Sequence, residues 1–483
     1  MQRISSSNRF AERIRFGSRT AILALAGLAL TACGSGGGGG GGGGSSTPSA
    51  FLLFRADDGS KGAEPWTSDG SGSGTELLKN IKGSGGDSRP DEFTRMGDTV
   101  FFKANGPDNS ELYKTDGTAG GTQQVKDINP SGYAGPQHLA TYDGALYFTA
   151  KDGSNGSELW RSDGTASGTR MVKDINPGPG DSEPGKALYS GLSPTVYNNH
   201  LYFNANDGTN GVELWRTDGT KAGTERVTDI NNGSDDSLPF GLTVAGGTAY
   251  FGAQDSSSNR DLYRVDTSGA SPKAVKVNSG NGIIPNSLVA FDGEVYFRAQ
   301  PAGGNFDYEL WRTASGGGIT QVKDINSGSN ASQAAPRLVF DGKLYLTANG
   351  GTDGTELWRS DGTASGTKQV ADINPGSNDS RIGALTVFNG ALYFQASDGS
   401  SGDELWRTSG GAVGQVADIN PGGDSDPAFL TVFDGTLYFR ADDGITGEEL
   451  WETDGTISGT QRVGDINTGL GDGLTGSAIF AFQ

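Results

Sequence analysis

The sequence predicts an all-β fold, a β-propeller of about nine four-stranded blades. Three observations predict it. One short phrase returns nine times, each copy holds four strand-like segments, and the two ends of the chain carry complementary parts of one copy. A fixed repeat of about 48 residues indicates one supersecondary unit that has been copied many times. We therefore expect most recurring residues to explain the fold, and the exceptions to the repeat to explain the function.

The recurring phrase is an acidic residue, usually a leucine, and then an aromatic residue, often followed by a turn rich in Gly and Thr. Its full form runs from Glu158 to Thr169. The copies lie about 45–48 residues apart, except that about 55 residues separate the third from the fourth. The aromatic residue falls at Trp66, Tyr113, Trp160, Trp215, Tyr263, Trp311, Trp358, Trp406 and Trp451.

The clearest copy spans residues 384–420 and predicts four strands. Residues 384–388 alternate in character, and the Asn-Gly pair that follows them is a strong hairpin signal before a second strand at 391–396. The third and fourth strands are expected at 404–408 and 415–419. Three tight connections and one long connection are typical of a propeller blade, whose long connection crosses to the inner strand of the next blade. The first strand should therefore be innermost.

The two ends of the repeat array should share one blade. Residues 51–56 resemble a second strand, and residues 478–482 resemble a first strand. One strand from the C-terminus and three from the start of the array would complete a ninth blade and leave no unfinished sheet edge. A β-solenoid is the alternative, but it would not split one unit between the two ends. We therefore expect residues 51–483 to form a single propeller domain of nine repeats.

Residues 1–33 have the features of an export signal. Arginines precede an apolar run at 21–30, which is too short to span a bilayer. The run ends in Leu-Thr-Ala-Cys33, which resembles the bacterial lipoprotein box, in which the cysteine is lipidated and becomes the new N-terminus. Gly34 rather than Asp follows it, and the resemblance then implies the outer membrane or cell surface. An ordinary signal peptide is the alternative. Residues 34–50, rich in Gly and Ser, should form a flexible tether.

The composition is strongly acidic. The net charge is −20, and without the arginine-bearing leader it is about −24. Such a charge repels phosphates, so we expect no nucleic-acid partner. The same charge suits cations or basic partners. We expect contact with a membrane through the lipid anchor alone, and an envelope protein or a glycan as the candidate partner.

The repeat resembles that of the bacterial ELWxxDGT-repeat proteins over residues 51–483. The copies around Tyr263 and Trp311 lack the Asp-Gly-Thr turn. That family is recognised by its repeat, so the resemblance implies a propeller-like surface lipoprotein but no particular activity. Full copies of the motif occur at 158–169, 213–224, 356–367 and 449–460.

The recurring aromatic and acidic residues are predicted to be structural. A large aromatic side chain suits the seam between two packed sheets, and a ligand site is not normally copied nine times. The acidic residue two positions before each aromatic should have a fixed partner, because a buried charge needs one. That partner should be a backbone amide or a neighbouring Arg or Lys.

The acidic loops raise the question of calcium. The crossings between blades and the turns between second and third strands should emerge on one face, and both carry aspartates. Their oxygens suit calcium, although the loops lack the full ligand set of an EF-hand, and the same residues stabilise turns by bonding their own backbone. Both interpretations stay open, and no other cofactor is expected. The candidate ligands are Asp152, Asp174, Asn176, Asp207, Asp229, Asp372, Asp398 and Asp443.

Patterns that would indicate catalysis are sparse. The two histidines, His138 and His200, fall in different blades, so the sequence does not indicate a Ser-His-Asp site, and we predict no catalytic residue. The many loop carboxylates leave a glycan-active hydrolase or lyase as one alternative. An outer-membrane assembly factor is the other alternative.

The exceptions to the repeat mark the candidate binding surface. The longer interval places about eight extra residues in the crossing at 181–195, which contains Lys186 and Tyr189. The fifth and sixth copies are irregular at 255–261 and 301–308. We interpret the chain as a lipid-anchored, extracytoplasmic propeller that acts as a binding or scaffold module at the cell envelope. Lys186 and Tyr189 are the candidate binding residues.

Overall fold

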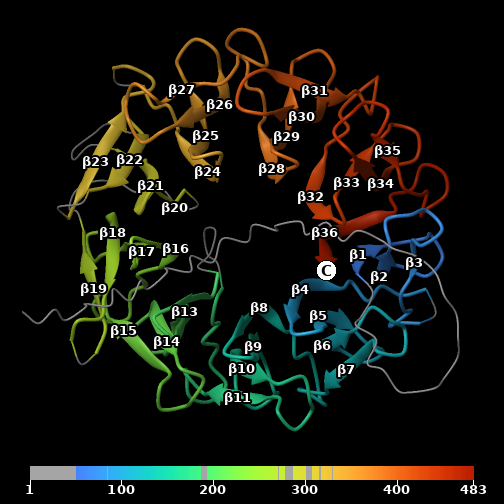
Figure 1. Ribbon diagram of the computed structural model, residues 1–483. Helices are drawn as coiled ribbons and strands as arrows, with labels where there is room; N and C mark the ends of the chain where they lie inside the picture. Colours follow the sequence, from blue (N-terminus) through green and yellow to red (C-terminus); the bar gives the residue numbers. More distant parts are fainter. Residues whose placement is uncertain are drawn as a thin grey trace, which may run out of the picture. The chain divides into compact units, whose positions relative to one another are not determined.

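The nine predicted blades are present. The compact unit Pro48–Gln483 contains nine four-stranded antiparallel sheets, arranged as blades around a central opening (Figure 1). The structure is a computed structural model, and no helix among the residues it describes is long and apolar enough to cross a membrane. It describes residues 50–83, 85–186, 193–269, 271–277, 287–300, 307–314, 317–328 and 330–483.

Each blade is a meander whose strands follow one another in the sheet as they do in the chain. Blade 1 contains β36 (Leu474–Phe482), β1 (Phe51–Ala56), β2 (Glu64–Ser68) and β3 (Glu76–Leu77). Blade 2 contains β4 (Asp91–Met96), β5 (Thr99–Asn105), β6 (Ser110–Thr115) and β7 (Gln123–Lys126). Blade 3 contains β8 (Gln137–Tyr142), β9 (Ala145–Ala150), β10 (Glu158–Ser162) and β11 (Arg170–Lys173). Blade 4 contains β12 (Thr195–Tyr197), β13 (His200–Asn206), β14 (Val212–Thr217) and β15 (Glu225–Thr228).

The remaining five blades repeat the same order. Blade 5 contains β16 (Phe240–Ala245), β17 (Thr248–Gln254), β18 (Arg260–Asp266) and β19 (Lys273–Lys276). Blade 6 contains β20 (Val289–Phe291), β21 (Glu294–Ala299), β22 (Glu309–Thr313) and β23 (Ile319–Lys323). Blade 7 contains β24 (Ala335–Phe340), β25 (Lys343–Asn349), β26 (Thr355–Ser360) and β27 (Lys368–Gln369). Blade 8 contains β28 (Gly383–Phe388), β29 (Ala391–Ser397), β30 (Asp403–Thr408) and β31 (Val413–Ala417), and blade 9 contains β32 (Ala428–Phe433), β33 (Thr436–Asp442), β34 (Glu448–Thr453) and β35 (Gln461–Arg462).

Blade 8 tests the strand predictions for residues 384–420. All four strands form close to the expected bounds, but the fourth ends at Ala417 instead of residue 419. The reason is that the Ile419 amide leaves the sheet ladder and donates to the carboxylate of Glu404, at 2.9 Å. The last two predicted strand residues therefore begin the crossing to the next blade.

The closing blade is confirmed. Strand β36 pairs antiparallel with β1, with Phe51 opposite Phe482 and Leu53 opposite Phe480. The rings of Phe51 and Phe482 stack with their centroids 4.9 Å apart. The two ends of the array thus share one sheet, and the ring of blades has no open seam.

The first strand of each blade lies innermost, as predicted. Strands β4, β8, β16, β20, β24, β28 and β32 surround the central opening in Figure 1. Side chains tie neighbouring first strands together: Thr386 Oγ1 donates to the Leu430 carbonyl at 3.1 Å, and Thr431 Oγ1 donates to the Ile479 carbonyl at 2.9 Å. The innermost strands are therefore joined to one another by hydrogen bonds as well as by packing.

The recurring aromatic residues fill the seams between blades, which confirms the structural interpretation. Trp160 of blade 3 packs in one cluster with Leu112, Val125 and Ile128 of blade 2. Trp358 of blade 7 packs in the same way against blade 6. Seam burial of this kind is the main source of stability in a repeat protein, because each repeat contacts its neighbours only.

Two kinds of connection share one end of each blade. In blade 3 the Gly156 amide, in the β9–β10 turn, donates to the Gly178 carbonyl of the crossing at 3.1 Å. The Ser157 amide donates to the Asp181 carboxylate of the same crossing at 2.8 Å. We call this end of the ring the crossing face, and the opposite end, where hairpins such as β4–β5 join first and second strands, the hairpin face.

Candidate functional site

The recurring acidic residue braces each third strand against the crossing that follows it. Glu158 is fully buried and accepts hydrogen bonds from the Ile175 amide at 2.7 Å, the Asn176 amide at 3.4 Å and Ser182 Oγ at 2.7 Å. The predicted backbone partner is therefore confirmed. Corresponding hydrogen bonds from crossing residues reach Glu64, Glu111, Glu213, Glu309, Glu356, Glu404 and Glu449.

Burial changes the protonation of these glutamates. Desolvation raises the pKa of Glu158 to about 7, although hydrogen bonds from Ser182 and from two crossing amides act to lower it. Desolvation likewise raises the pKa to about 7 at Glu111, Glu213, Glu404 and Glu449, and to about 6 at Glu356. Because each carboxylate already has an internal partner, this recurring acid belongs to the scaffold and not to a substrate site.

The predicted ligand aspartates at the turns act first as turn residues. Asp152 Oδ1 accepts the Ser154 and Asn155 amides at 2.9 and 2.8 Å. Similar pairs of amides bond Asp207, Asp398 and Asp443. Burial acts to raise the pKa of Asp398, but the hydrogen bonds from Ser400 and Ser401 outweigh it and hold the pKa at about 2.

The predicted ligands in the crossings are held separately. Asp174 and Asp372 each accept an amide from their own loop, at 3.3 and 3.4 Å, and Asn176 donates to the Asp181 carbonyl at 3.1 Å. Asp229 lies 3.6 Å from Arg226, which also lies 3.8 Å from Asp207. Within the described residues no three His, Cys, Asp or Glu side chains converge as a metal site would require. Calcium binding stays a prediction.

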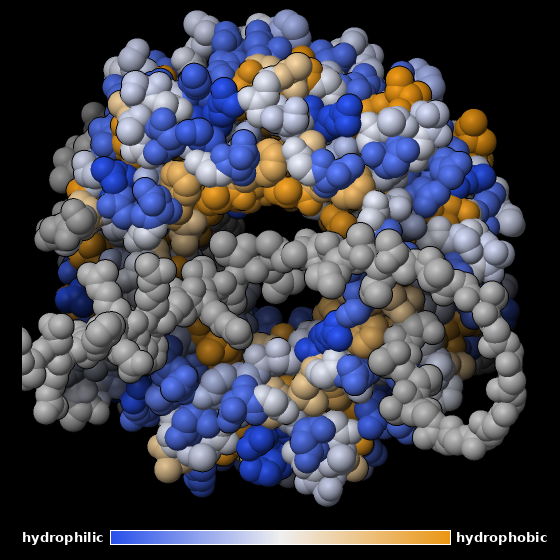
Figure 2. All heavy atoms as spheres, in the orientation of Figure 1, coloured by the Kyte–Doolittle hydropathy of each residue, from blue (hydrophilic) through white to orange (hydrophobic). Residues whose placement is uncertain are grey.

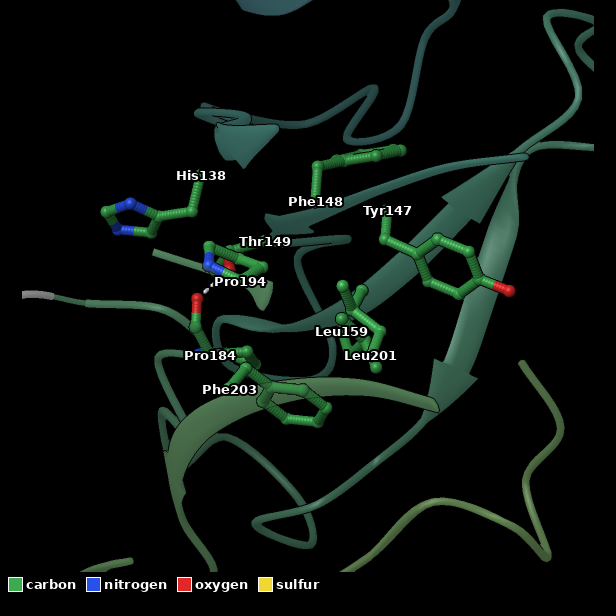
Figure 3. A pocket seen from close by; sticks show the side chains of 9 residues that line it. All are labelled: His138, Tyr147, Phe148, Thr149, Leu159, Pro184, Pro194, Leu201 and Phe203. Carbon is green, nitrogen blue, oxygen red and sulfur yellow. Dashed lines mark hydrogen bonds between the residues drawn. The ribbon is translucent and has the colours of Figure 1, made fainter. Parts of the chain in front are cut away.

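The long crossing carries Lys186 and covers a small cavity. Lys186 forms an ion pair with Glu183 at 2.6 Å, and the two side chains are 46% and 41% exposed. Tyr189 lies outside the described residues. Beneath the crossing is a cavity of about 10 Å³, room for about one water molecule (Figure 3). It is lined by His138, Tyr147, Phe148, Thr149, Leu159, Pro184, Pro194, Leu201 and Phe203.

That cavity is part of the scaffold. Thr149 Oγ1 donates to the Pro184 carbonyl, which ties the crossing down onto β9 (Figure 3). Burial lowers the pKa of His138, whose ring lies at the edge of the same cavity. The structure thus brings His138 to the long crossing but leaves Lys186 on the surface.

Two carboxylates that the sequence interpretation did not single out meet on blade 8. Gln395 Nε2 donates to Asp403 Oδ2 at 3.2 Å and to Asp426 Oδ1 at 3.3 Å, so the two carboxylates share one donor. Arg381 lies 3.5 Å from Asp403. Desolvation, with smaller contributions from Asp403 and Asp424, raises the pKa of Asp426. In the sequence these residues belong to a strand and a crossing, so spacing alone could not pair them.

An acidic cavity opens in blade 2, where the repeat is one residue shorter between its second and third strands. It has a volume of about 140 Å³. Gly106 stands where blade 3 has Asp152, and Tyr113 replaces the usual tryptophan. The shortened turn is the sequence feature that could have indicated this cavity, but the sequence interpretation did not use it. The lining residues are Gly106, Pro107, Asp108, Asn109, Glu111, Gln124, Asp127 and Pro130.

Aliphatic side chains, most of them exposed and two of them half-buried, gather at the central opening. They occupy one register position, because each pairs with the second residue of the second strand in its own blade. For example, Val339 pairs with Leu344 and Val387 with Leu392. Hydrophobic atoms line the margin of the opening over β24 and β28 (Figure 2). We call this set the aliphatic ring: Val196, Val244, Ala290, Val339, Val387, Val432 and Ala481.

The chain matches no family model and no curated protein. Among solved structures it is similar to puromycin hydrolase, at 15% identity and a TM-score of 0.38, over 79% of this chain and 61% of that one. It is also similar to the β-propeller domain of the Trilobed protease from Pyrococcus furiosus, at 11% identity and a TM-score of 0.36, over 69% of this chain and 99% of that one. This chain thus spans about three fifths of the puromycin hydrolase chain.

Likeness at this level carries no argument about activity. The fold itself defines the chain as a closed, nine-bladed β-propeller. The resemblance of its repeat to the ELWxxDGT-repeat proteins stays a prediction, as do the lipid anchor and the partners.

Proposed function

We propose that this chain is a lipid-anchored, extracytoplasmic propeller of the ELWxxDGT-repeat type that acts as a binding or scaffold module at the cell envelope. The aliphatic ring is the observation that supports a binding role best. Val339 and Val387 remain 40% and 41% exposed on innermost strands, whereas the recurring acids and aromatics are occupied inside the scaffold. Gathered apolar side chains on a surface are typical of protein-interaction sites, so the proposal favours a protein partner.

The anchor rests on the lipoprotein-like segment that ends at Cys33. Its test is the variant Cys33→Ser, expressed in the native host and followed by fractionation of the cells. The parent chain should sediment with membranes, and the variant should appear in the soluble envelope fraction. Equal retention of both chains in the membrane pellet would show that the anchor assignment is wrong.

The binding role is tested with the soluble body, residues 50–483, as bait. It is incubated with intact envelopes and, in parallel, with a glycan array. Capture of the same protein in repeated experiments, lost in a Val339→Ser, Val387→Ser variant, supports the proposal. Ile445→Ser is the matched control, because Ile445 is an exposed aliphatic residue outside the ring. An outer-membrane assembly factor is the version of this proposal in which the captured protein is itself a membrane protein.

A glycan-active hydrolase is the second candidate, and one observation favours it. The carboxyl groups of Asp403 and Asp426 are held together by Gln395, and the raised pKa of Asp426 suits a proton donor beside a second carboxyl group. Glycosidases of this kind place two carboxyl groups roughly 5–10 Å apart. If glycans on the array are cleaved, Asp426→Asn and Asp403→Asn should each abolish cleavage; the scaffold variant Glu404→Gln separates loss of chemistry from loss of folding.

A further inference from the structure

We propose that the aliphatic ring and the aspartates around it form a docking site for a cationic polypeptide segment that carries apolar side chains between lysines or arginines. This inference rests on the proposed binding role and names the chemistry of the partner, but it does not depend on the lipid anchor. Two independent features of the described residues carry it: the apolar character of one register position and the charge of the turns beside it.

The apolar side chains of the ring share one pairing position between the first and second strands of their blades. Each ring residue pairs with the same position of its second strand, for example Val196 with Leu201 and Val244 with Ala249. Leu201 and Ala249 are buried, whereas Val196 and Val244 are 48% and 39% exposed. The difference arises because a second strand is covered by the neighbouring blades, while the innermost strands stand around the opening. A ring of nine blades, more than the typical four to eight, sets these strands on a wider circle.

Two blades interrupt the apolar series, and their side chains are polar. Thr141 occupies the position in blade 3, and Arg95 occupies it in blade 2. Arg95 is turned toward the C-terminus: it donates to the Gln483 carbonyl at 2.6 Å and lies 4.4 Å from the centre of the Phe482 ring. Its charge is therefore engaged with blade 1, and it leaves the other seven positions as a continuous apolar arc.

The charged feature lies immediately beside the ring. The hairpin between first and second strands carries an aspartate in five blades, two or three positions after the register position of the ring. In blades 6, 7 and 9 that position is a ring residue, and in blades 2 and 3 it is Arg95 and Thr141. All five are exposed, and none forms an ion pair with a lysine or arginine that the structure describes. We call them the aspartate collar: Asp98, Asp143, Asp292, Asp341 and Asp434.

The aliphatic ring and the aspartate collar together favour one class of partner over the others. A second copy of this chain would bring its own collar and a net charge of −20, so like charges would oppose self-association. A nucleic acid or an anionic lipid surface would be repelled for the same reason. A neutral glycan would leave the collar unused and would cover apolar side chains with hydroxyl groups. A polypeptide with leucine-like side chains between basic residues satisfies both features, because it buries apolar area and pairs opposite charges.

The test uses the full chain, with Cys33→Ser to prevent lipidation, and three synthetic peptides in isothermal titration calorimetry. The first peptide carries leucines flanked by lysines, the second the same leucines flanked by glutamates, and the third serines flanked by the same lysines. We expect saturable binding of the first peptide alone. Val339→Ser with Val387→Ser should weaken it at least about tenfold, since two buried aliphatic contacts are lost. Asp341→Asn with Asp434→Asn should weaken it about threefold at low salt and have less effect at high salt.

Matched controls lie outside the site. Ile445→Ser removes an exposed aliphatic side chain on another loop, and Asp235→Asn removes an exposed acid from a crossing. Neither should change the dissociation constant. Equal weakening by Ile445→Ser and by the ring variant would overturn the assignment, as would equal binding of the glutamate peptide or no binding of any peptide.

Other occupants give distinct outcomes. Concentration-dependent dimerisation in sedimentation, lost in the double valine variant, would assign the ring to a second copy and overturn the proposal. Flotation with neutral phosphatidylcholine vesicles, lost in the same variant, would assign it to lipid and also overturn it. If the peptides fail while the double valine variant still captures a protein from envelopes, the proposed binding role stands and this docking site falls.

Discussion

Blade 3 and blade 5 differ in the groups that lie beside the recurring buried acid. Both bury the recurring acid of their third strand, Glu158 in blade 3 and Asp261 in blade 5. In blade 3 the carboxylate accepts two amides and a hydroxyl from the crossing. In blade 5 it lies 2.7 Å from Lys276, which also lies 2.8 Å from Asp255 in the turn. The position of Lys276, opposite the aromatic residue, is held by Met171 in blade 3.

The difference shows which part of the repeat is obligatory. The acid is retained in both blades, and in blade 5 an ammonium ion lies beside it. A buried carboxylate must be satisfied, but the chemistry of its partner is free to vary. The complete copies use the crossing as that partner, and this makes the crossing part of the scaffold as well as part of the surface.

The largest effect is expected from the seam that a complete copy builds. Trp358→Ala should lower the free energy of unfolding by about 3–5 kcal/mol, because the ring is buried among Leu310, Val322 and Leu346 and its removal leaves a cavity. Urea denaturation of the variant and parent measures it. Lys186→Ala is the control, since its exposed side chain has little packing to lose. Small and equal shifts in the two variants would contradict the seam role of the tryptophans.

The next effect concerns the ion pair of blade 5. Lys276→Met, which installs the residue that blade 3 carries there, should cost about 2–3 kcal/mol, because a fully buried carboxylate loses its nearby cation. Lys273→Met, which removes the other exposed lysine of the same strand, should cost far less. The double variant Lys276→Met, Asp261→Asn should recover part of the loss. A double variant no more stable than Lys276→Met alone would show that the carboxylate does not need this cation.

The glutamates of the complete copies predict an unusual dependence on pH. Burial raises the pKa of Glu158 from an ordinary 4.5 to about 7, so between those values the folded chain holds a proton that the unfolded chain has released. Stability should therefore fall as the pH rises from about 4.5 to about 7, and stay low above that. Below this window, stability should fall again as turn aspartates with lowered pKa values, such as Asp398, become protonated.

Urea midpoints measured from pH 4 to pH 8 test the sign. Glu158→Gln should flatten part of the decline, because one titrating group is gone. Glu76→Gln, at an exposed strand position, should leave the slope of the parent unchanged. A midpoint that rises steadily from pH 4.5 to 7 would contradict the assignment of these buried acids.

The sequence predicted the features that recur within single repeats, but it did not predict the features that arise when separate segments and blades come together. Four strands, the innermost position of the first one, the seam tryptophans and the shared closing blade all follow from patterns inside single copies, and the structure confirms them. The pairing of Asp403 with Asp426 depends on how a crossing folds back over a strand. The aliphatic ring depends on the number of blades, since Val339 alternates like any strand residue and is exposed only because the innermost strands stand apart.

The smallest effect is expected from calcium, and it again separates the two blades. In blade 3 the candidate ligands are Asp152 in the turn and Asp174 and Asn176 in the crossing, whereas in blade 5 the matching Asp255 forms an ion pair with Lys276. Because Asp152 Oδ1 already accepts two amides, we expect it to act as a turn residue and calcium to raise the melting temperature no more than sodium chloride at matched ionic strength. A metal site would give a different series: calcium would exceed magnesium, which releases its water reluctantly, and at ten times its dissociation constant it would add about 1.4 kcal/mol. Asp152→Asn decides between the two, since a turn residue tolerates asparagine with little loss, whereas a ligand role would abolish any calcium-specific rise.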